Sequence, residues 1–372
     1  MASTPFTLAA LATSAVPGLE VTGTRSHTAN GDGAFESAVL STTDGDVIVR
    51  IPNDANAEVR QSAEMLALAS LVDGSRARLP VAIPRTLGVT RAGDSRAVVS
   101  TFLPGAPATL EYIGVEPKLL QRVTEVIAAI HELPTRLVRE GGLPTRSSSE
   151  VREDAERLVQ RTADTGMLPA TVRSRWTSVL DADYIWSFEP TVVHGSLSAE
   201  VFLVDAEQLL GLLGWNELSL GDPAVDLGWL LADEPDTFTS ALARYTSLRG
   251  ISGSQEITTR ARFYHELEVA RWLLHGIETH DQTVVDDAVA MLDRLVDGLS
   301  LLGGALPMQR VLDAQEVEEM LDQTPIIDSD PRSETAEFES LDEDRAFDVE
   351  FEFSDDPSSD AKDTEGSGDG RG

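Results

Sequence analysis

HGSLSAEVFLV at residues 194–204 leads from a glycine-containing loop into a short apolar run. LLGWNE at 212–217 and GDPAVDL at 221–227 follow it, and each of the three segments contains a glycine beside its apolar residues. Short apolar runs bounded by Gly and Pro are typical of short strands. We therefore expect three short strands, at residues 191–193, 201–204 and 209–213.

Helical spacing flanks this segment on both sides. Apolar residues lie three or four apart within Leu119–Ile130, and again within Phe263–Leu274 and Val285–Leu299. Glu150–Asp164 is polar and charged, which predicts a helix on the surface. From Pro104 onward we therefore expect a mostly helical region that contains the short strands as a hairpin.

The first hundred residues favour strands. Val39-Leu40 and Val47–Pro52 are joined by Asp44-Gly45-Asp46, which indicates a hairpin. A further strand is expected at Ala97–Phe102, followed by the stiff connector Leu103–Pro107. Between them a helical stripe is expected, with its apolar face formed by Val59, Ala63, Leu66 and Leu71.

Composition excludes several classes of site and partner. There is no Cys among the 372 residues, so disulfides and thiolate metal sites are excluded, and the chain is expected to be cytoplasmic. The mildly apolar Thr7–Val16 has no Lys or Arg before it, which favours a core helix over a signal peptide. The net charge of −34 argues against nucleic acid and anionic membrane as partners. The excess of Arg over Lys is typical of a GC-rich bacterial source.

The last sixty residues differ from the rest. Residues 313–372 contain 22 acidic and 4 basic residues, a net of −18, which leaves −16 for the first 312. So little apolar surface predicts disorder. Glu316–Leu321 is expected to extend a helix at most, while Phe347–Phe353 alternates apolar and acidic residues and is a candidate site for a protein partner. A tail that only aids solubility remains the alternative.

The segments quoted first resemble the paired signature of the aminoglycoside and macrolide phosphotransferases: HGDxxxxN, then a strand ending in IDW, then GDPxxDLA. Val47–Pro52 (VIVRIP) is similar to the family's third strand, Phe102–Pro107 (FLPGAP) to its interlobe hinge, and His131–Pro134 (HELP) to the end of its first C-lobe helix. These matches keep the family's order over roughly residues 5–300. The resemblance implies an α+β, bilobal, protein-kinase-like fold.

The same resemblance implies a loss of catalytic groups. Phosphoryl transfer needs a carboxylate that activates the attacking hydroxyl and ligands that hold Mg²⁺ against the phosphates. The family's base position holds Ser196, and its two metal-ligand positions hold Val201 and Gly214. Loss of a general base alone typically costs about 10²–10⁴ in rate. No metal ligand is therefore expected, and Mg²⁺ binding is not favoured.

Residues with a structural role remain. His194 and Gly195 shape the loop, and the GDPxxDL pattern is retained at 221–227. By resemblance, Asp226 anchors the backbone of the loop. A retained framework without the reactive groups is typical of a pseudokinase.

Nucleotide binding is a separate question, and ATP or GTP binding stays open. Arg50 matches the family's phosphate-contacting cation and Glu64 its partner on the helix; a purely structural Arg50–Glu64 ion pair is the alternative. Asn30–Gly33 lies where a phosphate-covering loop belongs, but a plain hairpin turn explains it equally well. Metal-independent binding is favoured over the Mg²⁺-dependent kind.

Three carboxylates could rescue metal binding: Glu200, Asp205 and Glu217. The simpler interpretation is that they are solvated. His275, Glu278 and His280 have loose metal-ligand spacing, but a surface helix end is favoured. Four aromatic residues are candidates for a substrate cleft, although helical spacing favours the core: Trp229, Phe263, Tyr264 and Trp272.

Together these features predict an N-lobe at residues 1–103, a helical C-lobe at 104–307 with a degenerate catalytic loop, and an acidic tail at 308–372. The expected function is that of a catalytically impaired pseudokinase that acts as a binding or interaction module. The alternative is an active ATP- or GTP-dependent O-phosphotransferase for a small molecule that uses non-standard metal ligands. A cationic aminoglycoside would suit the acidic body and a macrolide an apolar cleft, and the sequence does not choose between them.

Overall fold

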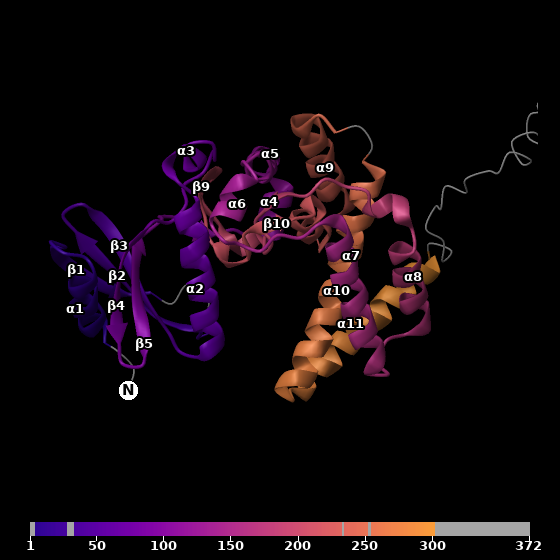
Figure 1. The fold of residues 1–372 in the computed structure, drawn as a ribbon, viewed down its shortest axis with the longest axis horizontal. Helices are drawn as coiled ribbons and strands as arrows, with labels where there is room; N and C mark the ends of the chain where they lie inside the picture. The colour runs from indigo at the N-terminus through magenta and orange to yellow at the C-terminus, as the bar shows by residue number, and fades with distance from the viewer. Residues whose placement is uncertain (1–3, 28–32, 233, 252–253, 302–372) are drawn as a thin grey trace, which may run out of the picture. The chain divides into compact units, whose positions relative to one another are not determined.

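The computed structural model describes residues 4–27, 33–232, 234–251 and 254–301 (Figure 1). Five antiparallel strands form a sheet in the order β1-β2-β3-β5-β4. The strands are β1 (Val21–Ser26), β2 (Phe35–Thr42), β3 (Gly45–Pro52), β4 (Thr86–Ala92) and β5 (Ser95–Thr101). The predicted hairpin is confirmed, because β2 and β3 pair in register through Thr42 and Gly45.

One face of this sheet is covered by α1 (Pro5–Ala15). Thr4 caps the helix by accepting a hydrogen bond from the Thr7 N–H, and Pro5 occupies the first turn, where no backbone donor is needed. Leu8 and Ala12 are buried against the sheet. The side chains that they meet are Ala38, Leu40, Val47, Val49, Ile51, Ala97 and Val99. The predicted first core helix is thereby confirmed.

The helix α2 (Ala55–Ser70) begins at Asp54, whose carboxylate accepts a hydrogen bond from the Ala57 N–H. The predicted apolar face was wrong at two positions, because Val59 is 68% and Leu66 47% exposed. The buried face is instead formed by Ala57, Gln61, Glu64, Ala67 and Leu68. It is partly polar because Gln61 and Glu64 make hydrogen bonds to Arg50 of β3, so hydrophobicity alone does not identify it.

The rest of the described chain is mainly helical. Its longer helices are α5 (Pro117–His131), α7 (Ser148–Asp164), α8 (Ala170–Leu180), α9 (Pro235–Arg249), α10 (Gln255–Thr279) and α11 (Gln282–Leu301). Shorter helices are α3 (Asp73–Arg76), α4 (Leu110–Val115) and α6 (Arg136–Glu140). The stripe predicted at Leu119–Ile130 is buried in α5, and α7 begins with a capping box between Ser147 and Glu150.

The three predicted short strands are β7 (Thr191–Val193), β8 (Phe202–Asp205) and β9 (Gln208–Leu212). β7 pairs with β10 (Ser219–Gly221), while β8 lies between β9 and β6 (Ala106–Pro107). Short 3-10 turns connect these elements: η1 (Asp183–Trp186), η2 (Ala199–Val201), η3 (Trp215–Glu217), η4 (Pro223–Asp226) and η5 (Gly228–Ala232). Trp176, Phe202, Trp215 and Tyr245 are fully buried around them.

The mixed α+β architecture, with a β-sheet near the N-terminus and helices after it, was predicted and is confirmed. Val201 is an exception in detail, because it ends η2 rather than starting β8. Asn30–Asp32, Glu316–Leu321 and Phe347–Phe353 lie outside the described residues. Within the described ranges, no helix is both long and apolar enough to span a bilayer.

Candidate functional site

The loop after β7 is held by one buried carboxylate. Asp226, at the end of η4, accepts a 2.7 Å hydrogen bond from the N–H of His194 and a 2.8 Å bond from that of Gly195, one on each oxygen. Asp226 has no solvent exposure. Two charge-assisted hydrogen bonds to consecutive backbone groups fix the orientation of the loop, since each such bond is worth about 1.5–3 kcal/mol.

A second connection ties Asp226 to the helices. His131, the last residue of α5, lies with Nε2 3.1 Å from an Asp226 oxygen and Nδ1 2.8 Å from the hydroxyl of Tyr245 on α9. Burial by itself would raise the pKa of the Asp226 carboxyl, but its bonds to His131 and the Gly195 N–H bring that pKa below its usual value. Asp226 is therefore an anion in a fully satisfied buried network.

His194 faces inward from the loop. Its Nε2–H donates a 3.0 Å hydrogen bond to the carbonyl of Leu213, and its ring packs edge-on against Trp215 at 4.8 Å between centroids. Burial lowers the pKa of His194 although Asp226 opposes the shift. The imidazole is therefore neutral at pH 7 and acts as a spacer that links the loop to the end of β9.

Ser196, Val201 and Gly214 lie together. The hydroxyl of Ser196 donates a 3.0 Å hydrogen bond to the Gly214 carbonyl, and the N–H of Leu213 donates a 2.9 Å bond to the carbonyl of Val201. A Cβ placed on Gly214 would lie 3.1 Å from Cγ1 of Val201. Three positions within the segment 196–214 thus form one corner, and their side chains supply one hydroxyl and no carboxylate.

Gly195 and Gly214 both need glycine's conformational freedom. Their φ angles are +84° and +80°, in the left-handed region that side chains disfavour. A Cβ on Gly195 would lie 2.6 Å from the carbonyl oxygen of Glu217, so the loop and η3 approach too closely for any side chain there. These contacts hold the corner in one arrangement.

Arg50 and Glu64 form an ion pair across the face of the sheet opposite α1. Nη2 of Arg50 donates to Oε2 of Glu64, and the guanidinium also lies 5.3 Å from the centroid of the Phe35 ring. α2, which carries Glu64, packs against η3, directly after Gly214. The arrangement therefore connects the sheet to the corner formed by Ser196, Val201 and Gly214.

Asp222 organises the segment before Asp226. Its Oδ1 accepts a hydrogen bond from the Ala224 N–H, while Oδ2 accepts 2.6 and 2.7 Å bonds from Arg260 Nε and the Tyr264 hydroxyl. Arg260 also donates to the carbonyl of Ile185. Tyr264, considered above as a cleft or core residue, is thus a buried partner of Asp222.

The carboxylates considered as substitute metal ligands are exposed: Glu200 on η2, Asp205 at the end of β8, and Glu217 on η3. Glu217 begins closest to the loop, because its Cβ lies 3.0 Å from the Cβ position of Gly195. Among the described residues, no group of three or more His, Asp and Glu side chains is arranged to hold a metal ion. Val201 and Gly214, at the positions that the resemblance assigns to metal ligands, supply no side-chain oxygen for Mg²⁺.

The remaining candidates separate into core and surface. Phe263 is buried, and Trp229 is half-buried and donates to the carbonyl of Asp226. Trp272 is 39% exposed, stacks on His275 and donates to Asp287. The helix end carrying Glu278 and His280 is exposed, which agrees with the simpler interpretation of that spacing.

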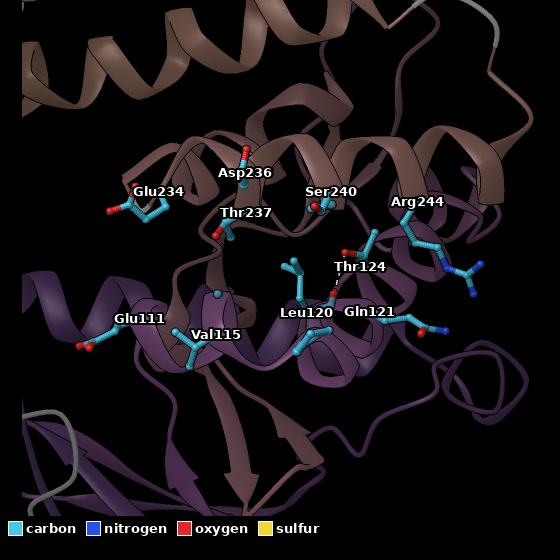
Figure 2. Close-up of a pocket in the computed structure, with 13 residues that line it drawn as sticks. Glu111, Val115, Leu120, Gln121, Thr124, Glu234, Asp236, Thr237, Ser240 and Arg244 are labelled. Carbon is cyan, nitrogen blue, oxygen red and sulfur yellow. Dashed lines mark hydrogen bonds between the residues drawn. The ribbon is translucent and has the colours of Figure 1, made fainter.

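A cavity of about 860 Å³ lies between α4, α5 and α9 (Figure 2). Glu111, Glu234 and Asp236 gather toward one end and Arg244 toward the other, with Val115 and Leu120 between them. Residues of the 194–201 loop do not line it. The cavity and the loop are therefore separate features.

Known proteins resemble this chain in sequence and in fold. The profile of the phosphotransferase enzyme family, APH, matches residues 28–264, which is more than half of the chain. The curated protein YcbJ of Bacillus subtilis (strain 168), itself uncharacterised, is 23% identical over 193 residues. That match covers 48% of this chain and 60% of YcbJ.

Solved structures share the fold. The apoenzyme of macrolide 2'-phosphotransferase MphH from Brachybacterium faecium is 23% identical with a TM-score of 0.64, covering 78% of this chain and 98% of its own. The GDP and kanamycin complex of APH(2")-IIia is 18% identical with a TM-score of 0.62, covering 77% and 97%. Macrolide 2'-phosphotransferase type I is 21% identical with a TM-score of 0.61, covering 78% and 98%. The predicted bilobal, kinase-like architecture is therefore confirmed.

Proposed function

The chain belongs to the phosphotransferase enzyme family, APH, and from that premise we propose that it is a catalytically impaired member, a pseudokinase, that acts as a binding or interaction module. The observation that carries this proposal is the corner formed by Ser196, Val201 and Gly214. None of these three residues is a carboxylate, while the backbone at His194 and Gly195 keeps its hydrogen bonds to Asp226.

The assignment of Ser196 to the base position has a chemical consequence. A serine hydroxyl does not accept a proton at neutral pH, and here it donates its own hydrogen to the Gly214 carbonyl. Among the described residues, Asp226 is the one carboxylate bonded to the 194–196 backbone, and its oxygens already accept from two N–H groups and contact His131. Asp226 serves as the anchor of the loop and not as a substitute base.

The absent Mg²⁺ site follows from the donor set. Mg²⁺ prefers oxygen ligands in near-octahedral geometry and is usually held by one or two carboxylates together with phosphates and water. Val201 carries only methyl groups, and Gly214 has no side chain. In this proposal the chain therefore lacks the charge neutralisation by Mg²⁺ that supports phosphoryl transfer.

Binding of ATP or GTP is a separable part of the proposal. The Arg50–Glu64 pair is formed, and a guanidinium presents a planar fork that suits phosphate oxygens. Glu64 neutralises Arg50 in this arrangement, so a nucleotide would have to compete for that cation. We propose that any nucleotide binding is weak and independent of Mg²⁺.

An active small-molecule O-phosphotransferase is the second candidate, and Glu217 is the observation that favours it. Its exposed side chain starts beside Gly195, and its carboxylate accepts a 3.3 Å hydrogen bond from the amide of the adjacent Asn216, which a turn toward the loop would break. Glu200 on η2 is the other exposed acid close to the loop in sequence. In that case the substrate would be either a cationic aminoglycoside or an apolar macrolide.

A turnover assay with ATP and GTP separates the two functions. The pseudokinase predicts no nucleotide-dependent phosphoryl transfer to aminoglycoside or macrolide acceptors in the wild-type chain. The enzyme predicts turnover that survives Ser196→Ala and is lost in Glu217→Ala or Glu200→Ala, with Asp94→Ala, at an exposed position between β4 and β5, as the control. Turnover with that dependence would sink the pseudokinase proposal. For the acidic tail, which lies outside the described residues, we propose a protein partner with a basic, partly apolar surface.

A further inference from the structure

A second cavity, of about 840 Å³, lies among α8, α10 and α11, next to the turn η1. Its apolar lining consists of Ala182, Ile185, Val269, Met291, Leu295 and Leu299. Its charged lining consists of Arg175, Arg262, Arg294 and Glu266, with His265 beside them. The cavity thus combines an apolar wall with an excess of cations.

This cavity lies on a different side of α10 from the loop network. Arg260 and Tyr264 point toward Asp222, whereas Arg262 lines the cavity. Because successive residues of a helix are about 100° apart, Arg262 projects about 200° away from both Arg260 and Tyr264. The cavity is therefore distinct from the site built around Asp226.

One of the cations is already neutralised. Arg175 donates from Nε and Nη2 to both oxygens of Glu266 at 2.6–2.9 Å, and Nε1 of Trp176 donates to the same carboxylate at 2.9 Å. Arg175 and Glu266 are largely buried in this contact. Among the described residues of the lining, Glu266 is the one carboxylate, and because it is already paired it offers little attraction to a cationic ligand.

Arg262 and Arg294 are different. Both are solvent-exposed, and neither is ion-paired with another residue in the described part of the chain. Three arginines and one glutamate give the lining a net charge of +2, counting His265 as neutral because burial lowers its pKa. In a chain of net charge −34, a local cationic surface of this kind is unusual and selects anions.

The helical hairpin of α10 and α11 supplies both cationic and apolar groups to the cavity. α10 and α11 are joined by a short turn at His280 and Asp281 and pack side by side (Figure 1). Residues equally far from that turn lie at similar levels, so Val269 is level with Met291, and Arg262 lies further from the turn. Arg294 lies between Met291 and Leu295 along α11, and Leu299 is as far from the turn as Arg262, so each cationic group has an apolar neighbour in the cavity wall.

We propose that this cavity binds an amphipathic anion, a molecule with an apolar body and a carboxylate or phosphate head. The body would lie against Val269, Met291 and Leu295, and the head would bond to Arg262 and Arg294. Guanidinium groups suit both head groups, so the two are distinguished by measurement. This binding site is independent of the loop and of any phosphoryl transfer.

Isothermal titration of the full chain tests the site with decanoate, decyl phosphate and decyltrimethylammonium, each below its micelle concentration. We expect saturable binding of one molecule per chain for at least one anion, and no binding of the cation. The stronger of the two anions identifies the head group. Equal binding of the cation, or no binding of either anion, would overturn the proposal.

Two sets of variants separate charge from shape. Arg262→Gln with Arg294→Gln should weaken the anion at least about tenfold, because two charge-assisted hydrogen bonds are lost. Arg173→Gln, an exposed arginine on α8 outside the cavity, is the matched control and should bind like the wild type. Unchanged affinity in the double variant contradicts the assignment.

Gly298 offers a test that leaves every charge in place. It lines the cavity, and a Cβ added there meets nothing within 4 Å, so Gly298→Phe should fill the space without a backbone clash. We expect Gly298→Phe to abolish binding while Gly298→Ala retains it. A folded Gly298→Phe variant, verified by circular dichroism, that still binds the anion would place the ligand elsewhere.

Discussion

The hydroxyl of Ser196 donates a 3.0 Å hydrogen bond to the backbone carbonyl of Gly214. In the family to which the chain belongs, by resemblance, the first position is that of the catalytic base and the second that of a metal ligand. Here the two are bonded directly to one another. This contact joins two neutral groups, a hydroxyl and a backbone carbonyl, and includes no carboxylate.

Gly214→Asp should destabilise the chain by about 2 kcal/mol, because it places a side chain at φ +80° and 3.1 Å from Val201. Gly166→Asp is the matched control, since Gly166 has φ +74° but nothing within 4 Å of the added Cβ. Urea unfolding measures both variants. An equal loss in the two would mean that the Val201 contact contributes nothing.

A double-mutant cycle isolates that contact. Combining Gly214→Asp with Val201→Ala removes the facing methyl group. The double variant should therefore lose roughly 1 kcal/mol less unfolding free energy than the two single variants lose in sum. Additive free energies of unfolding would contradict the packing described here.

Restoration of the site is a further prediction. Ser196→Asp, Val201→Asn and Gly214→Asp together return the base and the two metal ligands that the resemblance implies, and we expect them to recover binding of Mg²⁺ with ATP or GTP. The measurement is a thermal shift in nucleotide with and without Mg²⁺. If the folded triple variant gains nothing, the cleft has changed beyond these three positions.

Asp226→Asn should cost about 3 kcal/mol of unfolding free energy, because an amide nitrogen would replace one of the two buried acceptors for the N–H groups of His194 and Gly195. Asp205→Asn, at an exposed position, is the control. Chemical denaturation measures both. A loss below about 1 kcal/mol would show that the loop does not depend on this carboxylate.

Stability should fall in mild acid. Burial, as the largest cause, lowers the pKa of His27, His194 and His265 below the unfolded value of about 6.5. As the pH falls from 6.5 through the folded pKa values, the unfolded chain binds more protons, so the free energy of unfolding decreases. The lowered pKa of Asp226 adds a second loss, which begins below about pH 4.

His194→Gln tests the contribution of His194 to that slope. The glutamine amide can still donate to the Leu213 carbonyl but does not titrate. Urea unfolding between pH 7 and 5 should therefore show a shallower decrease than in the wild type, and His275→Gln, at an exposed position, is the control. An unchanged slope would assign the acid sensitivity to other groups.

Tyr264→Phe should cost about 1 kcal/mol, since it removes one hydrogen bond to Asp222 while Arg260 stays. Tyr184→Phe, with the ring 52% exposed, is the control. Unfolding free energies measure both, and equal values would show that the Tyr264 hydroxyl contributes no net stability.

Local patterns predicted most of the fold. The stripe in α5 and the β2–β3 hairpin depend on apolar spacing and on Asp44-Gly45-Asp46, which are visible within a few residues. The resemblance located Arg50 and Glu64 as a pair, and the structure shows the ion pair. In contrast, α2 was assigned the wrong apolar face because its inward side contains Gln61 and Glu64, which bond to Arg50.

Partners far apart in the sequence could not be predicted. In the sequence, His131 stands out only as part of the HELP segment. In the structure it contacts Asp226 and Tyr245 from the end of α5. Arg260 gave no local signal for its bond to Asp222, because a buried arginine on a long helix has the same pattern as an exposed one. These contacts form only when the helices pack together in the folded chain, so no local sequence pattern indicates them.

Calorimetric titration of the full chain with ATP and with GTP, each in Mg²⁺ and again in a chelator, tests most directly the proposal that the chain has no magnesium site. We predict either no binding or weak binding of equal affinity in both conditions, because no side chain in the Ser196, Val201 and Gly214 corner can hold the ion. Binding that is at least tenfold tighter in Mg²⁺, and that Glu217→Ala or Glu200→Ala removes, would contradict this account.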